Sequence, residues 1–337
     1  MSPAAAAASF PVIDFSPFFT TGGGENEVEK EEVINSIREA CSDYGFFVAV
    51  NHGIPAEAMD RSLEMAHEFF DRPSEEKLKC TPPTSDTPVT TGYAKQPDHS
   101  PNKNEYFLMF EPASAFNVYP TSPAPFRGAV DEIYGGLLAM ARLIESLMNR
   151  CLGVPEGLME KFNDDRQWDI MTAFRYFAAA ELETPDKKTG LYGHKDVNLM
   201  TLVLQDQVGG LEFQKDGEWI PITPIPHSLV VNVGDIIQVL SNNKFKSVNH
   251  KVNSPQGRDR HSFAFAYLIG FEKMVEPLAE VMKESKEEPK FSKFRYKDYF
   301  QLRVADLFNP PANLDDAVTI NHYAIPPTVA AAAAPAN

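Results

Sequence analysis

The sequence predicts a mainly β protein with helices packed on the outside of its strands. Residues 168–270 contain short runs rich in Val, Ile, Leu, Phe and Thr, separated by Gly, Pro, Asn and Asp. Many short strands at close spacing, without helices between them, are typical of an antiparallel sandwich or barrel. Residues 128–152 instead carry an apolar stripe at helical spacing, which Gly153 ends. A long helix with one apolar face normally backs a sheet.

The first third of the chain mixes helices and strands. Apolar residues recur at helical spacing from about 30 to 44, where Gly45 interrupts the pattern, and again over 55–71. The stretch 81–104 is rich in Pro, Thr, Asp and Asn, so we expect a long loop of the kind that often has a function. Two apolar runs in this region predict strands, at 10–15 and 46–50.

The β-rich segment contains seven strand candidates, and the chain after it is more highly charged. After residue 270 the charge density rises, a helix is expected near 296–307, and the final residues are of low complexity. The expected strands are 199–204, 211–214, 218–222, 228–233, 236–240, 246–252 and 261–269.

Composition and charge exclude several classes of function. The 337 residues include 31 Lys and Arg against 47 Asp and Glu, which gives a formal net charge of −16. A chain this acidic lacks the positive surplus needed to neutralise phosphates, so nucleic acid and anionic membranes are not expected partners. The helix at 128–152 is interrupted by charged residues, so we expect no membrane span.

The cysteines and the N-terminus indicate the compartment. The three cysteines, Cys41, Cys80 and Cys151, are far apart and form no Cys-x-x-Cys pair, which fits a reducing environment. The N-terminal alanine run has no preceding basic residue and is too short for a secretory signal. We therefore expect a cytoplasmic protein.

A possible metal site stands within the β-rich segment. Residues two apart on a strand face the same way, so His194 and Asp196 can direct an imidazole and a carboxylate toward one point. His250 follows on a later strand candidate and could complete the set. Two His and one carboxylate on one face leave positions open on a metal, as non-haem Fe(II) oxygen chemistry requires. Taken alone, the pair also fits a strand with two half-exposed polar residues.

Ten residues after His250, a second pair extends the pattern. Arg260 and Ser262 share a strand face on which Ala264 and Ala266 follow. A guanidinium and a hydroxyl beside small residues suit a carboxylate, because the planar guanidinium can bind it with two hydrogen bonds. A strand arginine in a surface ion pair is the plainer alternative.

Together, these motifs resemble the plant iron(II)- and 2-oxoglutarate-dependent dioxygenases. The branch they are most similar to includes flavonol synthases, anthocyanidin synthases and gibberellin oxidases. The likeness is collinear over most of the chain. It comprises FPVIDF (10–15), REACSDYGFFVAVNHGIP (38–55), FFDRPSEEK (69–77), HKDVNLMTLVLQD (194–206), GGLEF (209–213), LVVNVGD (229–235), LSNNKFKSVNHKV (240–252) and RHS (260–262).

The resemblance implies a fold and a division of the chain. The fold is a double-stranded β-helix, the jelly roll of isopenicillin N synthase, with helices on its outside. Residues 1–125 would form an N-terminal region of helices and strands packed on the core. Residues 126–310 would form the jelly-roll core with its backing helix, and 311–337 a C-terminal extension and loose tail.

The resemblance also implies roles for five residues already named or matched. His194, Asp196 and His250 would be the iron ligands. Arg260 would pair with the distal carboxylate of 2-oxoglutarate, and Ser262 would hydrogen-bond to it.

One further family motif is altered. The family usually has Asn-x-Tyr before the metal motif, and the tyrosine also touches the co-substrate. Here the stretch is Phe174-Arg175-Tyr176. Tyr176 is retained, whereas Phe174 makes this wall of the pocket more aromatic and removes a polar contact.

The implied activity is the oxidation of a C–H bond in a small plant specialised metabolite or hormone. Fe(II) would be the cofactor and 2-oxoglutarate and O2 the co-substrates, with ascorbate as a stimulant and succinate and CO2 as products. Hydroxylation, O-demethylation and desaturation all stay open, and a monomer is expected. Two alternatives are an ascorbate-dependent oxidase that does not use 2-oxoglutarate and a non-enzymatic binding protein. Four aromatic residues are candidates for the substrate pocket: Phe107, Phe110, Phe174 and Tyr299.

Overall fold

The computed structural model describes residues 10–19, 26–82, 87–98, 100, 102–162, 166–179, 189–308 and 318–326. The N-terminal alanine run and the low-complexity end of the chain lie outside these ranges. Within them, no helix is both long enough and apolar enough to cross a membrane.

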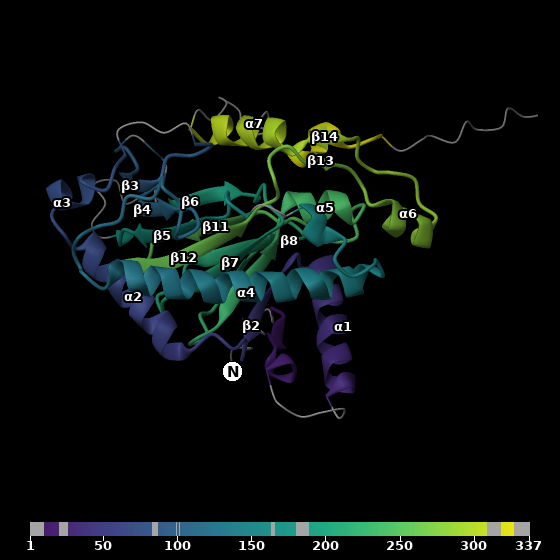
Figure 1. Ribbon diagram of the computed structural model, residues 1–337, viewed down its shortest axis with the longest axis horizontal. Coiled ribbons are helices and arrows are strands. Elements are labelled where there is room, and N and C mark those ends of the chain that lie inside the picture. The colour runs from purple at the N-terminus through teal and green to yellow at the C-terminus, as the bar shows by residue number, and fades with distance from the viewer. Residues whose placement is uncertain are drawn as a thin grey trace, which may run out of the picture.

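Eight strands form the larger sheet, which lies behind helix α4 in Figure 1. β1 runs parallel to β2, and the other pairings described in this sheet are antiparallel. The predicted strands at 10–15, 46–50, 199–204, 228–233 and 261–269 are confirmed within about two residues. In spatial order the strands are β1 (Val12–Asp14), β2 (Phe46–Val50), β10 (Leu229–Val233), β7 (Met200–Gln205), β12 (Arg260–Tyr267), β5 (Ile170–Tyr176), β4 (Asn104–Met109) and β3 (Gly92–Lys95).

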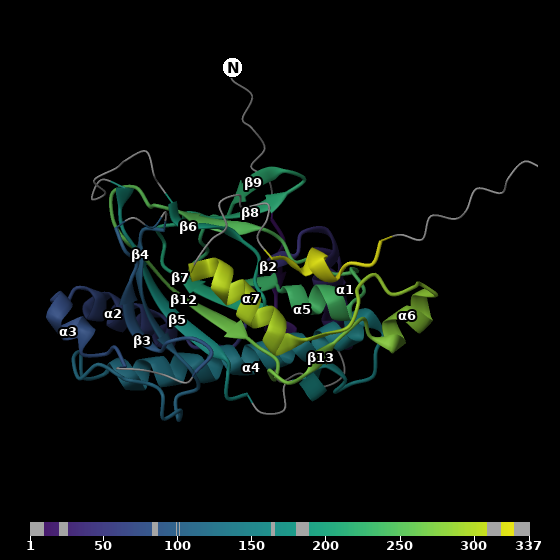
Figure 2. The same ribbon diagram turned by 90° about the horizontal axis from the view of Figure 1, so that it is seen from above.

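A smaller sheet faces the inner side of the larger one (Figure 2). The two inner faces meet in an apolar cluster, where the rings of Phe46 on β2 and Phe213 on β8 stack with centroids 4.1 Å apart. Two opposed antiparallel sheets with a shared core are the expected jelly roll, so this prediction of the fold is confirmed. The smaller sheet consists of β6 (Thr189–His194), β11 (His250–Asn253), β8 (Leu211–Lys215) and β9 (Glu218–Pro221).

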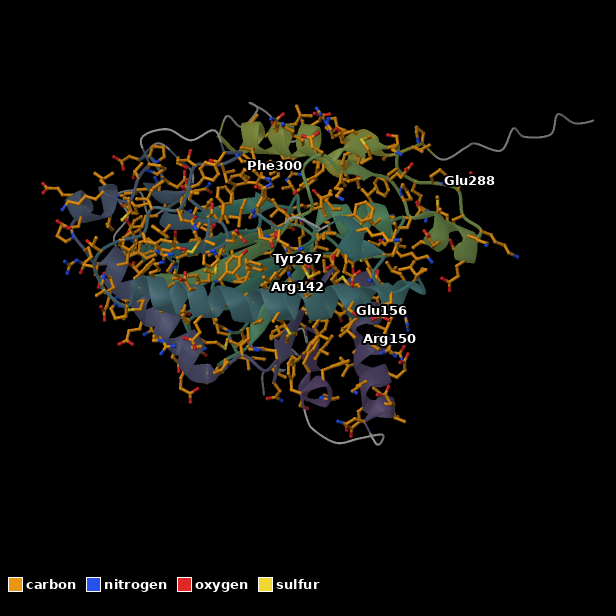
Figure 3. All side chains as sticks on the ribbon, in the orientation of Figure 1. Arg142, Arg150, Glu156, Tyr267, Glu288 and Phe300 are labelled. Carbon is orange, nitrogen blue, oxygen red and sulfur yellow. The ribbon has the colours of Figure 1, made fainter. Side chains whose placement is uncertain are left out.

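Helices cover the outer face of the larger sheet (Figure 1). The longest, α4 (Phe126–Leu152), buries the predicted apolar stripe and ends at Gly153, which adopts the left-handed conformation with φ 67°. Tyr267 of β12 points from the sheet to this helix (Figure 3) and donates a hydrogen bond to Glu145. The other N-terminal helices are η1 (Ser16–Phe18), α1 (Glu27–Asp43), α2 (Ala56–Phe70), α3 (Ser74–Leu78) and η2 (Met159–Phe162).

The C-terminal segment lies on a different side of the strands (Figure 1). The helix expected near 296–307 is present as α7 (Tyr296–Phe308), and Phe300 points from it toward the body of the protein (Figure 3). Phe300 is buried against Phe271, with ring centroids 5.0 Å apart. The remaining elements here are β13 (Met274–Val275), α6 (Ala279–Ser285), β14 (Phe294–Arg295) and η5 (Ile320–Tyr323).

Three local predictions were wrong. The apolar run 236–240 belongs to a short helix, α5 (Asp235–Leu240), in which every residue is buried. A fully buried run has no polar face, so periodicity does not distinguish a helix from a strand. The stretch predicted as a loop at 81–104 contains β3, and the strand predicted at 246–252 begins only at His250. The division of the chain at residue 125 stays a prediction, although strands β1 to β4, which precede it, belong to the larger sheet.

Candidate functional site

Two histidines and one aspartate meet at the end of the smaller sheet. His194 is the last residue of β6 and stands directly opposite His250, the first residue of β11. The Oδ1 atom of Asp196 lies 3.6 Å from Nε2 of His194 and 3.8 Å from Nε2 of His250. One ligand atom from each residue lies within 4.8 Å of the other two. The three residues can therefore hold a single metal ion.

Strand alternation does not produce this convergence, contrary to the prediction from sequence. β6 ends at His194, and Asp196 lies in the turn that follows. The pairing of β6 with β11 shifts register beside this site. His194 faces His250 and Leu191 faces Val252, so β6 contains one residue more than β11 over the same stretch. Such bulges re-aim side chains beside functional sites. Here the bulge and the turn together bring the imidazole and the carboxylate to one point.

Backbone hydrogen bonds from the start of α5 hold the turn that carries Asp196. The backbone N–H of Asp235 donates to the carbonyl of Asp196 at 2.8 Å, and that of Gly234 donates to Leu199 at 2.7 Å. A Cβ atom at position 234 would lie 2.1 Å from the carbonyl oxygen of Asn198. Only glycine allows the backbone of α5 to approach the turn this closely.

Hydrogen bonds orient all three ligands. Nδ1 of His194 lies 2.8 Å from the carbonyl oxygen of Tyr192, and Nδ1 of His250 lies 3.4 Å from that of Val248. A carbonyl oxygen only accepts, so Nδ1 carries a proton in each ring, which leaves Nε2 as the atom that can bind a metal.

The Asp196 carboxylate is oriented in the same manner. Its Oδ2 atom accepts hydrogen bonds from Thr201 Oγ1 at 2.5 Å and from Asn232 Nδ2 at 2.8 Å. These donors leave Oδ1 directed toward the two imidazoles. Thr201 and Asn232 were not singled out from the sequence, because the signal that marks them is their contact with Asp196 in the folded chain.

The surroundings fix the protonation states that metal binding requires. Burial, with the neighbouring His194, lowers the pKa of His250 to about 4, so this imidazole is neutral at physiological pH. Burial alone would raise the pKa of Asp196, but His250, His194 and the hydrogen bond from Thr201 hold that pKa well below its usual range. Two imidazoles and an ionised carboxylate on one face form a donor set that fits Fe(II).

A second polar cluster lies on β12 and its neighbours. Arg260 is 1% exposed, and its guanidinium donates to Ser262 Oγ at 3.1 Å and to Gln205 Oε1 at 2.8 Å. The guanidinium carbon also lies 4.9 Å from the centre of the Tyr176 ring. Within the described ranges, Nε of Arg260 has no hydrogen-bond partner and the side chain forms no ion pair. Asp206 interacts with this guanidinium electrostatically but forms no ion pair with it, so the buried cation can still bind the carboxylate of a ligand.

The polar cluster around Arg260 and the candidate metal site belong to the same interior. Tyr176, on β5, packs in the cluster between the two sheets. A Cβ atom on Gly190 of β6 would lie 2.8 Å from the Tyr176 ring, so glycine at this position lets that ring contact the strand that carries His194.

The four aromatic candidates for the substrate pocket occupy different regions. Phe174 lies between the sheets, 5.4 Å from the ring of Tyr176 and 6.0 Å from that of Tyr106. The other three candidates pack elsewhere: Phe107 against Phe126 in the outer core, Phe110 against Trp168, and Tyr299 with its hydroxyl on Asp235. Tyr106 was not singled out from the sequence, because strand pairing with β5 is what places it beside Phe174.

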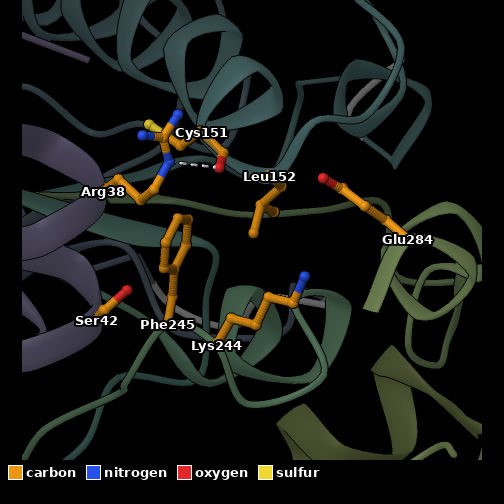
Figure 4. A pocket seen from close by; sticks show the side chains of 7 residues that line it. All are labelled: Arg38, Ser42, Cys151, Leu152, Lys244, Phe245 and Glu284. Atoms are coloured by element: carbon orange, nitrogen blue, oxygen red, sulfur yellow. Dashed lines mark hydrogen bonds between the residues drawn. The ribbon is translucent and has the colours of Figure 1, made fainter. Parts of the chain in front are cut away.

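A surface pocket of about 430 Å³ lies between α1, the end of α4, the segment after α5 and α6 (Figure 4). Nε of Arg38 donates to the carbonyl of Cys151 there, at 2.9 Å. None of the residues that line this pocket belongs to the His194, Asp196 and His250 group or to the polar cluster around Arg260.

Two protein-family models match the chain. Residues 168–269 match the 2OG-Fe(II) oxygenase superfamily, and residues 10–121 match the family described as non-haem dioxygenase in morphine synthesis N-terminal. DMR6-LIKE OXYGENASE 2 of Arabidopsis thaliana is 31% identical over 300 residues, which cover 87% of this chain and 82% of that protein. A flavonol synthase/flavanone 3-hydroxylase of Matthiola incana is 29% identical, with 83% of this chain and 96% of that protein covered.

Solved structures agree with the sequence relatives. JOX2, crystallised in complex with 2OG, Fe and JA, superposes with a TM-score of 0.74 at 27% identity, covering 92% of this chain and 89% of that chain. The rice dioxygenase for auxin oxidation gives a TM-score of 0.74 at 23% identity, covering 94% and 100%, and thus shares the fold. The chain therefore belongs to the 2OG-Fe(II) oxygenase superfamily, as an oxidoreductase with Fe(II) as cofactor and 2-oxoglutarate as co-substrate.

Proposed function

We propose that this enzyme oxidises a C–H bond of a small plant specialised metabolite or hormone and releases succinate and CO2. The proposal rests on one observation: the His194, Asp196 and His250 cluster shares an interior with Arg260, which is buried and forms no ion pair with the described residues. The three ligands would hold Fe(II), and Arg260 would hold the distal carboxylate of 2-oxoglutarate.

The chain's own residues position and protect the reacting groups. When bound, Fe(II) together with 2-oxoglutarate and O2 supplies the oxidising power for C–H cleavage. The Nδ1 hydrogen bonds of the two histidines and the Oδ2 hydrogen bonds of Asp196 keep the ligand atoms aimed at the metal. The apolar cluster between the sheets keeps water from the site.

Around the co-substrate, Ser262 and Tyr176 would complete the carboxylate pocket. The Tyr176 hydroxyl hydrogen-bonds Ser262 and Arg260, and burial of this phenol raises its pKa. The phenol therefore stays protonated and can donate to a carboxylate.

The substrate would be an apolar or aromatic molecule with a polar group. Phe174 stands beside Ser262 in the strand register, and with Tyr106 and Tyr176 it forms an aromatic wall. The Tyr106 hydroxyl, on a half-buried side chain, has no hydrogen-bond partner among the residues that the structure describes and could donate to a substrate oxygen. Two similar proteins support this class: one is named a flavonol synthase/flavanone 3-hydroxylase, and JOX2 was crystallised with JA beside 2OG and Fe.

The test follows succinate rather than a chosen product. Purified protein with Fe(II), ascorbate and 2-oxoglutarate is incubated with fractions of a plant metabolite extract. We expect fractions that stimulate succinate formation to contain a compound whose mass changes in equal molar amount. His250→Ala should abolish both changes while circular dichroism shows an intact fold.

Two results would contradict the proposal. Turnover that needs ascorbate but neither consumes 2-oxoglutarate nor yields succinate would indicate an oxidase of the other type. Full turnover by His250→Ala, in protein verified to contain metal, would remove that residue from the iron site.

A further inference from the structure

The C-terminal helix reaches the metal-binding turn through one arginine. Arg303 of α7 donates from its Nη2 atom to the carbonyl oxygen of Lys195 at 2.8 Å. Lys195 is the residue between His194 and Asp196. The Arg303 side chain is 13% exposed, so solvent competes little with this charge-assisted hydrogen bond.

Arg303 is itself held in place by two buried partners. Its Nη1 atom lies 3.3 Å from Oδ2 of Asp235 and 3.1 Å from the Tyr299 hydroxyl. The Tyr299 hydroxyl donates to the same Oδ2 atom at 2.6 Å. Asp235 and Tyr299 are fully buried, so the guanidinium is fixed by an ion pair and a hydrogen bond away from bulk water.

The two sides of this network reach consecutive peptide groups of the turn. Arg303 binds the carbonyl of Lys195, and the backbone N–H of Asp235 binds the carbonyl of Asp196. Fixing two successive carbonyls fixes the orientation of the backbone that carries the Asp196 side chain. The network therefore joins α7 and α5 to the metal-binding turn.

We propose that Arg303 is a positioning residue for the metal site, which keeps the turn in the conformation that aims Asp196 Oδ1 at His194 and His250. The inference rests on the proposed role of these three residues as iron ligands. Outer partners of metal ligands tune affinity because they pre-orient the ligands before the metal arrives. Tyr299 and Asp235 hold Arg303 in turn, so Tyr299 contributes to the same positioning.

The test measures metal affinity directly, with Co(II) as a spectroscopic substitute for Fe(II). Co(II) is titrated into the wild-type apoprotein, Arg303→Met, Arg303→Lys and Tyr299→Phe, and binding is followed by visible absorption. Arg303→Met should raise the Kd for Co(II) about 10- to 100-fold, the usual effect of losing an outer partner. It should also change the Co(II) absorption bands, because the carboxylate is no longer held in one orientation.

Two further variants separate positioning from folding. Arg303→Lys retains the positive charge beside Asp235, so its melting temperature should stay near that of the wild type. Lysine lacks the second donor group, so this variant should still bind Co(II) more weakly than the wild type. Tyr299→Phe should give a smaller increase in Kd, because it removes only the hydroxyl that holds Arg303.

Arg295 supplies a matched control. It stands at the end of β14, just before α7, with a side chain 43% exposed, and it pairs with Asp298 and Glu272 on the surface. Arg295→Met should leave both the Kd and the absorption bands unchanged. A similar loss of affinity in Arg295→Met and Arg303→Met would contradict the proposal, since it would reflect only lost charge.

Different results would overturn the iron site and the role of Arg303. A wild-type protein that binds no Co(II), or binds it equally well after His250→Ala, would overturn the iron site itself. Wild-type binding that depends on His250, with unchanged Kd and unchanged bands in folded Arg303→Met and Arg303→Lys, would overturn only the role of Arg303. A lowered melting temperature with unchanged affinity per folded molecule would assign Arg303 a purely structural role.

Discussion

Arg260 and Tyr176 stand opposite each other in the pairing of β12 with β5, and the guanidinium carbon lies 4.9 Å from the centre of the phenol ring. The ring covers one face of a cation that is buried and has no ion-pair partner in the described part of the chain. The stacking and the hydrogen bonds to Ser262 and Gln205 fix the guanidinium before a ligand binds. Pre-organisation of this kind lowers the entropy cost of binding a carboxylate.

Replacing Arg260 should weaken the binding of 2-oxoglutarate. We expect Arg260→Met to raise the KM for 2-oxoglutarate by about 10- to 100-fold, since charge-assisted hydrogen bonds each contribute about 1.5–3 kcal/mol. The kcat at saturating 2-oxoglutarate should fall much less, because the metal ligands are untouched. Steady-state kinetics with varied 2-oxoglutarate measure both values. An unchanged KM would place the co-substrate carboxylate elsewhere.

The His250 imidazole should make the stability of the metal-free protein depend on pH. Its pKa is about 4 in the folded protein, below the ordinary value of 6.5, so the unfolded chain binds more protons between these values. Stability should therefore fall as the pH drops from about 6.5 to 4, by about 3 kcal/mol for this group.

The measurement for this pH effect compares two apoproteins. Urea unfolding is measured for the wild type and for His250→Gln at pH 7 and pH 4, so that the two proteins differ only in this titrating group and in its effect on Asp196. The wild type should lose stability relative to the variant at pH 4. A difference between the two that is independent of pH would show that folding does not lower the pKa of His250.

A methyl group at position 234 should damage the metal site. In Gly234→Ala the new Cβ would lie 2.1 Å from the Asn198 carbonyl, so α5 and the metal-binding turn must move apart. We expect a loss of about 1–3 kcal/mol in the free energy of unfolding, with weaker Co(II) binding. The control is Gly135→Ala in α4, where a Cβ meets no atom within 4 Å and alanine should stabilise the helix by about 0.5–1 kcal/mol. Equal effects of the two variants would contradict the close-approach argument.

The buried pair of Lys77 and Glu105 should contribute to stability far more than its exposed neighbour. Lys77 Nζ lies 2.7 Å from Glu105 Oε2, and the two side chains are 7% and 2% exposed. Lys77→Met leaves a buried carboxylate without its main cation and should cost about 3 kcal/mol in urea unfolding. Lys79→Met removes an exposed pair with Glu76 and should change stability far less, because solvent screens exposed charges. Similar costs for both would mean that Glu105 is compensated without Lys77.

Linear patterns predicted the strands and helices with strong periodicity, and they predicted that His194, Asp196 and His250 lie together. They did not predict how Asp196 reaches His194, because a bulge and a turn depend on pairing with β11. Strand pairing likewise decides that Tyr106 faces Phe174, whereas Phe107 packs in the outer core. The Arg303 network joins positions 68 residues apart in sequence, and no local pattern marks such contacts.

The position of β2 in the larger sheet has a consequence for synthesis of the chain. β2 is almost entirely buried, and its antiparallel partner β10 begins 179 residues after β2 ends, because 229 − 50 = 179. At the usual pace of translation, this interval is roughly 10–40 s. Throughout it, the Phe46–Val50 segment has only the short parallel strand β1 beside it, and its other edge is open to pairing with other chains. We therefore expect the nascent chain to be most prone to aggregation before β10 emerges.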